Sequence, residues 1–232
     1  MKNKKTLVVF SGAGMSAESG IKTFRDTNGL WEEYKIEDVA TPQAFAKNPA
    51  LVLDFYNQRR KQVIAAKPNK GHLILAELED YFDVKIVTQN IDDLHERAGS
   101  SNVLHLHGEI MKSRSSLSPN KIFDIDGSEI RLGEKAPDGS QLRPHIVWFG
   151  EEVPQMQNAI QIAQQAEILL IIGTSLNVYP AASLIQFVDF DCQVYLIDPN
   201  ANEMKLPTNI RIINQTAVNG LETVRKELLK SI

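Results

Sequence analysis

The sequence predicts an α/β protein built on a parallel, doubly wound sheet. Short apolar segments rich in β-branched residues alternate with longer segments of helical periodicity, which is typical of parallel strands joined by helical crossovers. We expect strands at residues 6–10, 84–88, 103–107, 168–172, 193–197 and 209–213, and helices at residues 48–66, 70–81, 92–98, 156–166, 180–187 and 217–229. Sheets of this kind bind ligands at the carboxyl ends of their strands, so the polar side chains that follow these strands should meet.

Composition sets the class of protein. The 232 residues, 43% hydrophobic and 23% charged, suit one globular domain with an insertion. A net charge of −4 and a pI near 5.8 do not suggest a specific nucleic-acid partner. The basic start is not followed by a signal peptide, no apolar run could span a bilayer, and Cys192 is the single cysteine. We therefore expect a cytoplasmic location, with no membrane contact, disulfide or cysteine metal cage.

The first predicted strand leads into a glycine turn at residues 12–14. A helix is expected from Ser16, and the N–H groups at such a turn suit a phosphate. The turn lacks the third glycine of the dinucleotide fingerprint and the lysine of a P-loop, so an ordinary strand-to-helix turn is an equal interpretation. The continuation favours a ligand, because Phe24 and Arg25 are typical of a flap that offers a ring and an anion-binding guanidinium.

A second polar cluster follows the next predicted strand. Hydroxyl, amide and carboxylate side chains succeed one another in residues 88–95, which suits recognition of a sugar and a carboxamide. Asp92 or Asp93 can instead cap the short helix that follows, and this interpretation accounts for part of the pattern. It does not account for Gln89 and Asn90.

Two histidines lie in the third predicted strand, His105 and His107, the latter directly before Gly108. Alternation along a strand places both side chains on one face. A histidine at a strand end has a pKa near neutrality and can serve as a general base. A buried histidine with a structural hydrogen bond, or a His-x-His metal pair, would explain the same residues, although no third metal ligand is evident.

Together these segments resemble the sirtuin family, the NAD-dependent protein lysine deacylases. The resemblance rests on residues 12–16, 20–25, 88–95, 107–108, 147–151, 173–175 and 178–180, whose order and spacing cover almost the whole chain. It implies a single catalytic domain. A Rossmann-like core is expected at approximately residues 1–30, 68–108 and 144–232, and a smaller inserted subdomain at approximately residues 31–67 and 109–143.

The resemblance implies an NAD site at the strand ends. The residues it assigns to the cofactor are Gly12, Ala13, Gly14, Ser16, Phe24, Arg25, Gln89, Asn90, Ile91, Asp92, Gly173, Thr174, Ser175, Asp198 and Ala217. Asn90 and Asp92 would orient nicotinamide and its ribose while the acyl oxygen attacks ribose C1′. His107 would then deprotonate a ribose hydroxyl, so the implied catalytic residues are His107, Asn90 and Asp92, with no metal. The implied products are free lysine, nicotinamide and O-acyl-ADP-ribose.

The resemblance also implies an acyl-lysine protein or peptide as substrate. The residues expected to pair with the substrate backbone as an added strand and to wall the lysine tunnel are Val147, Trp148, Phe149, Gly150 and Glu151, with Val178 and Tyr179. Trp148 and Phe149 can instead be ordinary core aromatics. The enzyme is expected to be a monomer.

A further pair bears on the choice of acyl group. Tyr56 and Arg59 lie at i and i+3 on one expected helix face, and they resemble the Tyr-x-x-Arg pair of sirtuins that accept succinyl, malonyl or glutaryl lysine. A guanidinium and a phenol together bind a distal carboxylate through charge-assisted hydrogen bonds. Ala40 leaves room for a bulkier acyl group. A surface arginine beside a half-buried tyrosine is the alternative.

The sequence departs from the family at three places. Lys22 stands where the flap usually has a proline, and Asp198 stands where an asparagine usually reaches the adenosine ribose. Sirtuins usually hold zinc with four cysteines between His107 and Pro144, and this chain has none there. Hydroxyls are poor zinc ligands, so we expect no zinc and a subdomain without the usual zinc ribbon, held by apolar contacts. The residues expected to make these contacts are Ile110, Ile122, Phe123, Ile125, Ile130 and Leu132.

Other functions can use the same pocket. An NAD hydrolase or a mono-ADP-ribosyltransferase shares the departure of nicotinamide, but a pure hydrolase does not need the peptide edge at residues 147–151. A non-catalytic NAD-binding module does not need His107. A hydride-transferring dehydrogenase fits worst, because nothing resembles its substrate domain.

Overall fold

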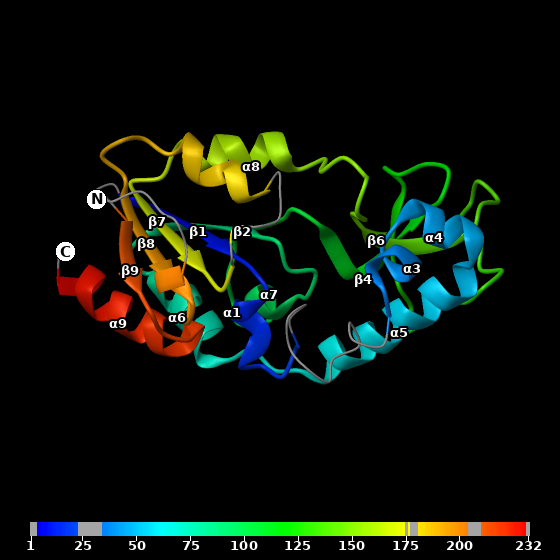
Figure 1. The fold of residues 1–232 in the computed structure, drawn as a ribbon, viewed down its shortest axis with the longest axis horizontal. Coiled ribbons are helices and arrows are strands. Elements are labelled where there is room, and N and C mark those ends of the chain that lie inside the picture. The colour runs from blue at the N-terminus through cyan, green and yellow to red at the C-terminus, as the bar shows by residue number, and fades with distance from the viewer. Residues whose placement is uncertain (1–3, 23–33, 175, 177–180, 204–209, 231–232) are drawn as a thin grey trace.

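The computed structural model describes residues 4–22, 34–174, 176, 181–203 and 210–230. Within them, the main sheet has six parallel strands in the order β3-β2-β1-β7-β8-β9 (Figure 1). The strands are β1 (Thr6–Ser11), β2 (Asp83–Thr88), β3 (Val103–His105), β7 (Ile168–Ile172), β8 (Gln193–Ile197) and β9 (Ile210–Ile213). The strand order reverses between β1 and β7, and ligands bind beside such a reversal. The predicted doubly wound fold is confirmed.

Helices cover both faces of the main sheet (Figure 1). They are α6 (Lys70–Leu78), α7 (Leu94–Arg97), α8 (Met156–Ala163), α9 (Ala217–Lys230) and the 3₁₀ helix η1 (Ala181–Phe187). Leu7 and Val9 of β1 enter the core beneath α6 and α9, whereas Val8 and Phe10 enter the core beneath α8 and η1. Burial on both faces explains why these strands are continuous apolar runs.

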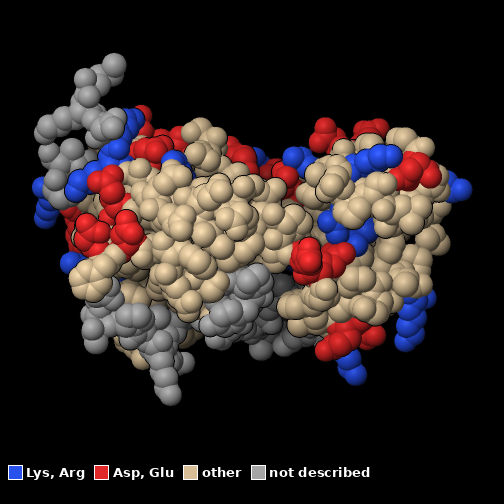
Figure 2. Space-filling view, turned by 90° about the horizontal axis from the view of Figure 1, so that it is seen from above, with Lys and Arg blue, Asp and Glu red and all other residues tan. Residues whose placement is uncertain are grey.

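The face that carries α8 has few charged side chains (Figure 2). The sequence of α8 is MQNAIQIA, without a charged residue. The surface over α8 is therefore mainly uncharged. Among the helices that the structure describes, none combines the length and the apolar character of a membrane span.

A smaller sheet lies at the opposite end of the molecule from α9 (Figure 1). Its antiparallel strands run in the order β5-β4-β6, and they are β4 (Gly108–Ser115), β5 (Ile122–Asp124) and β6 (Leu142–Ile146). Helices α3 (Ile36–Val39), α4 (Pro42–Lys47) and α5 (Pro49–Ala65) complete this subdomain. The predicted core boundary at residue 144 falls inside β6, which pairs with β4 and so belongs to the smaller sheet.

Side-chain caps fix where α4 and α5 begin. The hydroxyl of Thr41 accepts the N–H of Ala44 at 3.0 Å, and Oδ1 of Asn48 accepts the N–H of Leu51 at 3.2 Å. A proline stands in the first turn of each helix, where its missing N–H costs no hydrogen bond. The register of α5, which carries Tyr56, is therefore set by local sequence.

Some element boundaries differ from the prediction. The strand predicted to reach His107 ends at His105, because the chain turns there and enters β4 through Gly108, whose φ of 81° suits glycine. The helix predicted from Ser16 is the short α1 (Gly14–Ala17), which ends before Gly20 at a φ of 85°. Tighter i→i+3 turns end α6 and α8 before residues 81 and 166, and residues 181–187 form a 3₁₀ helix.

Apolar contacts hold the small subdomain largely as predicted. The predicted residues that are buried, or that pack against buried residues, are Ile110, Ile130, Phe123 and Ile125. The prediction was wrong for Ile122 and Leu132, which are 45% and 61% exposed. Alternation along the short β5 turns Ile122 outward when Phe123 turns inward.

A hydrogen-bonded cluster joins the end of β4 to the loop before β6. The hydroxyl of Ser115 donates to Oδ2 of Asp138 at 2.7 Å and accepts the N–H groups of Leu117 and Ser118 at 3.1 and 2.8 Å. Oδ1 of Asp138 accepts the hydroxyl of Ser140 at 2.6 Å. Hydroxyls and one carboxylate do not fit zinc, and the described residues contain no group of three or more His, Cys, Asp or Glu that could hold a metal.

Ser115→Ala should lower the free energy of unfolding by about 1–3 kcal/mol, because the removed hydroxyl satisfies several polar groups. Urea denaturation measures this change. The exposed neighbour Ser116 provides the matched control, and Ser116→Ala should stay within about 0.5 kcal/mol of the parent chain. Equal stability of the two variants would contradict a structural role for the cluster.

Candidate active site

Residues 88–91, at the exit of β2, are bonded to residues 105–110 through four successive backbone carbonyls. The pairs, donor first, are Leu106 N to Thr88 O at 2.9 Å, His107 Nδ1 to Gln89 O at 3.1 Å, His105 Nδ1 to Asn90 O at 2.9 Å, and Ile110 N to Ile91 O at 2.8 Å. Two of the donors are side chains. The backbone of the predicted nicotinamide segment and the two histidines are therefore fixed by the same bonds.

His107 has the tautomer that a general base needs. The Gln89 carbonyl can only accept, so Nδ1 of His107 carries the proton and Nε2 keeps its lone pair. Burial lowers the pKa of His107, although the hydrogen bond to Gln89 acts in the opposite direction. The imidazole is therefore neutral near pH 7 and can take a proton.

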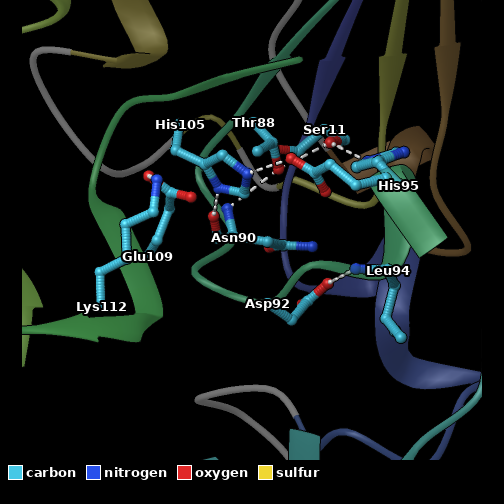
Figure 3. Close-up of polar contacts among 10 residues, drawn as sticks. Ser11, Thr88, Asn90, Asp92, Leu94, His95, His105, Glu109 and Lys112 are labelled. Carbon is cyan, nitrogen blue, oxygen red and sulfur yellow. Dashed lines mark hydrogen bonds and ion pairs between the residues drawn. The ribbon is translucent and has the colours of Figure 1, made fainter. Parts of the chain in front are cut away.

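Asn90 and Asp92 meet at the hydroxyl of Ser16. Nδ2 of Asn90 donates to Oγ of Ser16 at 3.1 Å, and Ser16 donates to Oδ2 of Asp92 at 3.0 Å. Oδ1 of Asp92 accepts the N–H of Leu94, the first residue of α7, at 3.2 Å, as Figure 3 shows, whereas the N-cap residue Asp93 makes no capping bond with its side chain. Burial raises the pKa of Asp92, against the effect of these hydrogen bonds and of the charge on His105. The amide and the carboxylate are thus presented together.

The glycine turn after β1 packs directly against the loop after β7. A Cβ atom on Gly12 would lie 2.8 Å from the carbonyl oxygen of Gly173, and one on Gly14 would lie 2.7 Å from Cα of Gly173. Gly173 itself has a φ of 59°. Only glycine permits this approach, so the two loops meet through backbone atoms at the strand reversal, and we call this pair of loops the glycine cradle. The hydroxyl of Thr174 donates to Oε1 of Gln89 at 3.0 Å and so joins the loop after β7 to the segment after β2.

The other predicted cofactor residues lie along the same edge or outside the described residues. Ala13 belongs to the glycine turn, Ile91 to the segment after β2, Asp198 follows β8, and Ala217 opens α9. Phe24, Arg25, Ser175, Val178 and Tyr179 lie outside the described residues.

Residues 147–151 connect β6 to the centre of the molecule, and much of their polar surface is already bonded. The N–H groups of Val147 and Phe149 donate to the carbonyls of His107 and Ala40 at 2.9 and 3.0 Å. The carboxylate of Glu151 accepts the N–H of Trp148 at 2.8 Å. Trp148 is buried, as the core interpretation expected, whereas Phe149 is 47% exposed.

Two arginines hold the carboxylate of Glu151. Arg114 and Arg143 each donate to both of its oxygens, at distances from 2.7 to 3.1 Å. The guanidinium of Arg143 also lies 3.2 Å from the ring centroid of Trp148. Glu151 was predicted to bind substrate, and the structure gives its carboxylate to these arginines. It therefore positions the segment that carries Trp148 and Phe149.

Tyr56 and Arg59 share one face of α5. The phenol oxygen of Tyr56 accepts the indole N–H of Trp148 at 3.0 Å, and burial raises the pKa of Tyr56 to about 12. The neutral phenol retains its own proton to donate. The guanidinium of Arg59 lies 5.7 Å from the ring centroid of Phe55; burial lowers its pKa, while Tyr56 and Asp92 act in the opposite direction. An arginine remains charged at neutral pH.

Sequence reasoning assigned no partner to His105 and missed Glu96. Nε2 of His105 lies 2.8 Å from Oε1 of Glu96, while Nδ1 binds the Asn90 carbonyl. The alternation that placed His105 beside His107 was the available signal. It carried no information about Glu96, which lies in α7.

Comparison with known proteins agrees with this geometry. The profile of the Sir2 family matches residues 12–180. An NAD-dependent protein deacylase of Helicobacter pylori (strain J99) is 53% identical, covering 97% of this chain and 96% of the relative; that of Bacteroides thetaiotaomicron is 51% identical, covering 97% and 98%.

Solved structures agree over the same length. A crystal structure of a Sir2 homologue in complex with NAD superimposes with a TM-score of 0.86 at 38% identity, covering 98% of this chain and 91% of that chain. A Sir2 variant with a deacetylated p53 peptide and 3′-O-acetyl ADP-ribose gives 0.76 at 28% identity, covering 97% and 94%. Since profile, relatives and fold agree over nearly the whole chain, the chain belongs to the Sir2 family, the sirtuins.

Proposed function

We propose that this NAD-dependent protein deacylase removes acetyl groups, the acidic acyl groups succinyl, malonyl and glutaryl, or both kinds from lysine side chains, giving nicotinamide and O-acyl-ADP-ribose. The observation that carries the proposal is that a neutral His107 is bonded to the backbone of the segment whose Asn90 and Asp92 meet at Ser16, beside the glycine cradle. The comparisons favour this reaction over an NAD hydrolase or a mono-ADP-ribosyltransferase.

The cradle fits a dinucleotide. Because a side chain at Gly12 or Gly14 would collide with Gly173, only glycine lets the two loops approach at the strand reversal, where the diphosphate would lie. The N–H groups of Gly12, Gly14 and Gly173 are bonded to backbone carbonyls, so the diphosphate would rely on other groups of these loops. NAD, when bound, supplies an electrophilic ribose carbon and a nicotinamide leaving group. Asn90 and Asp92 would hold the carboxamide and ribose, with Gln89 at a ribose hydroxyl. The hydroxyl of Ser16 bonds both the side-chain amide of Asn90 and the carboxylate of Asp92, and so holds these two side chains together.

His107 would remove a proton from a ribose hydroxyl. Its Nδ1 is fixed by the Gln89 carbonyl, so Nε2 is the atom that receives the proton. The carbonyl of His107 accepts the N–H of Val147, which ties the base to the substrate segment. Base and substrate edge are therefore positioned by adjacent bonds.

Tyr56 and Arg59 would recognise an acidic acyl group. Asp92 raises the pKa of Arg59, so the guanidinium lies within electrostatic range of the nicotinamide site. The Tyr56 phenol is neutral and has a proton to donate, and Ala40 nearby is small and buried. Together they suit a carboxylate at the end of an acyl chain.

The remaining proposals concern the substrate and the setting. An acyl-lysine peptide would add as a strand along residues 147–151. Because the N–H groups of Val147, Trp148 and Phe149 are already bonded, this pairing relies on the other backbone groups of the segment. We propose a monomeric, cytoplasmic enzyme that works without zinc.

His107→Gln should lower kcat for deacylation by roughly 10²- to 10⁴-fold, because the amide cannot take the proton. Nicotinamide exchange, which precedes that step, should survive. In the parent enzyme, the lowered pKa of His107 places the loss of activity on acidification below the ordinary histidine value of 6.5. A pH profile of kcat/KM measures this limb. Near-normal deacylation by the variant would refute the assignment.

Arg59→Met should cut kcat/KM for succinyl-lysine peptides on the order of ten- to a hundredfold, because a charged hydrogen bond is lost. Deacetylation should stay equal or improve, since an acetyl group has no carboxylate. Lys61→Met, an exposed change two residues along α5, is the matched control and should alter neither activity. A parallel loss of both activities in Arg59→Met would make Arg59 structural and the enzyme a plain deacetylase.

Activity should withstand chelators, and elemental analysis should find no stoichiometric zinc, because the Ser115 cluster offers hydroxyls and a single carboxylate, whereas structural zinc takes four thiolate, imidazole or carboxylate ligands. One zinc per chain, removed together with activity, would contradict zinc independence.

A further inference from the structure

His105 joins the nicotinamide segment to α7. It is the last residue of β3, and its side chain is 7% exposed. Nδ1 lies 2.9 Å from the carbonyl oxygen of Asn90, and Nε2 lies 2.8 Å from Oε1 of Glu96. Figure 3 shows the ring directed toward Asn90, with Glu109 and Lys112 on the β4 side. The buried imidazole of His105 therefore bridges the segment after β2 and helix α7.

Both ring nitrogens of His105 act as donors. A carbonyl and an ionised carboxylate only accept, so Nδ1 and Nε2 both carry protons and the ring is positively charged. Burial alone would lower the pKa of His105, but the bonds to Glu96 and Asn90 outweigh it and raise the pKa. Burial alone would raise the pKa of Glu96, but the hydrogen bond and the charge of His105 outweigh burial, so the pKa of Glu96 is lowered. The two partners hold each other in the charged state.

The surroundings of His105 strengthen this state. The charged and titratable groups around it are Glu96 and His95 of α7, Glu109 and Lys112 of β4, and Asp92. Glu109 raises the pKa of His105 and is itself bound to Lys112 at 3.0 Å. The positive ring lowers the pKa of Asp92, against the effect of burial. His105 thus favours the ionised carboxylate in the cofactor site.

The Asn90 carbonyl is the point at which this pair acts. The other three carbonyls of residues 88–91 accept from two backbone N–H groups and from His107. Without His105, the Asn90 carbonyl would lose its partner in a buried segment, and the peptide between Asn90 and Ile91 could rotate. That rotation would move the Asn90 amide and the chain leading to Asp92.

We propose that His105 and Glu96 form a positioning pair for the nicotinamide end of the site, in which Glu96 fixes the imidazole and the imidazole holds the Asn90 peptide. Neither side chain needs to touch NAD. The inference rests on the proposed NAD reaction but not on the acyl preference. It predicts that damage to the pair weakens NAD and nicotinamide binding and spares the acyl-peptide site.

The test compares two replacements of His105 with different hydrogen-bonding capacity. In asparagine, Nδ2 lies the same number of bonds from Cβ as Nδ1 of histidine, so His105→Asn keeps a donor for the Asn90 carbonyl. His105→Leu keeps bulk and removes the donor. We expect His105→Leu to raise the Kd for NAD, measured by calorimetry, and the KM for NAD by about tenfold. His105→Asn should recover most of both, with the KM for acyl peptide within about twofold in each variant.

Glu77→Gln is the matched control, because Glu77 is an exposed glutamate that pairs with Arg225 on the outside of α6. It should bind NAD as the parent chain does. Equal losses of NAD binding in His105→Asn and His105→Leu would overturn the positioning role. Equal increases in the KM for NAD and the KM for acyl peptide would overturn it as well. If His105→Leu does not fold, the comparison of His105→Asn with the parent chain decides: a tenfold loss in NAD binding overturns the role, and near-parent binding supports it.

A second measurement does not use the enzyme's activity. Side-chain ¹⁵N NMR of the ligand-free protein should show His105 titrating above the ordinary histidine pKa of 6.5 and His107 titrating below it. A raised pKa means that the proton is present below that pKa and lost as pH rises through it. Glu96→Gln keeps the size of the side chain and removes its charge, so His105 should lose its proton at a lower pH. An unchanged titration of His105 in Glu96→Gln would overturn the pairing, even if the deacylase reaction were correctly assigned.

Discussion

The active site depends on the four carbonyls of residues 88–91, which accept hydrogen bonds from residues 105–110. Beyond the end of β3 the sheet no longer supplies ladder partners, and unpaired buried carbonyls are costly. The chain provides two imidazole donors and two backbone donors instead. The same hydrogen bonds satisfy the backbone carbonyls and orient the two imidazole rings. The positions of His107, Asn90 and Asp92 are therefore fixed together. A change at any of the four bonds should therefore reach all three side chains.

The small subdomain is coupled to this constraint through Ile110. Its N–H donates to the carbonyl of Ile91, and its carbonyl accepts Nε of Arg60 at 2.7 Å. Arg60 is fully buried, and burial lowers its pKa to about 10, so it remains charged at neutral pH. It lies in α5, the helix that carries Tyr56 and Arg59. The helix proposed to read the acyl group is thus bonded, through one residue of β4, to the segment proposed to hold nicotinamide.

Local sequence predicts the elements well and their side-chain partners poorly. β7 and β8 begin and end where predicted, because burial on both faces demands continuous apolar runs. The convergence of the polar segments is equally predictable, since parallel strands end at one edge. In contrast, Trp148 binds Tyr56 across 92 positions of the chain, and His105 binds Glu96 from another element. Such pairs arise from tertiary packing, and neither periodicity nor motif spacing encodes them.

Two polar clusters near the end of β4 explain how the small sheet can keep its shape without cysteines. Ser115 and Asp138 join the end of β4 to the loop before β6, while Glu151 joins Arg114 of β4 to Arg143 of β6. Buried ion pairs add little net stability, because desolvation offsets their attraction, but breaking one leaves a costly unpaired charge. These ion pairs therefore favour one arrangement of the small sheet over alternative arrangements more than they add to its stability. Here the selected arrangement places Trp148 against Tyr56, which links the small subdomain to the proposed acyl pocket.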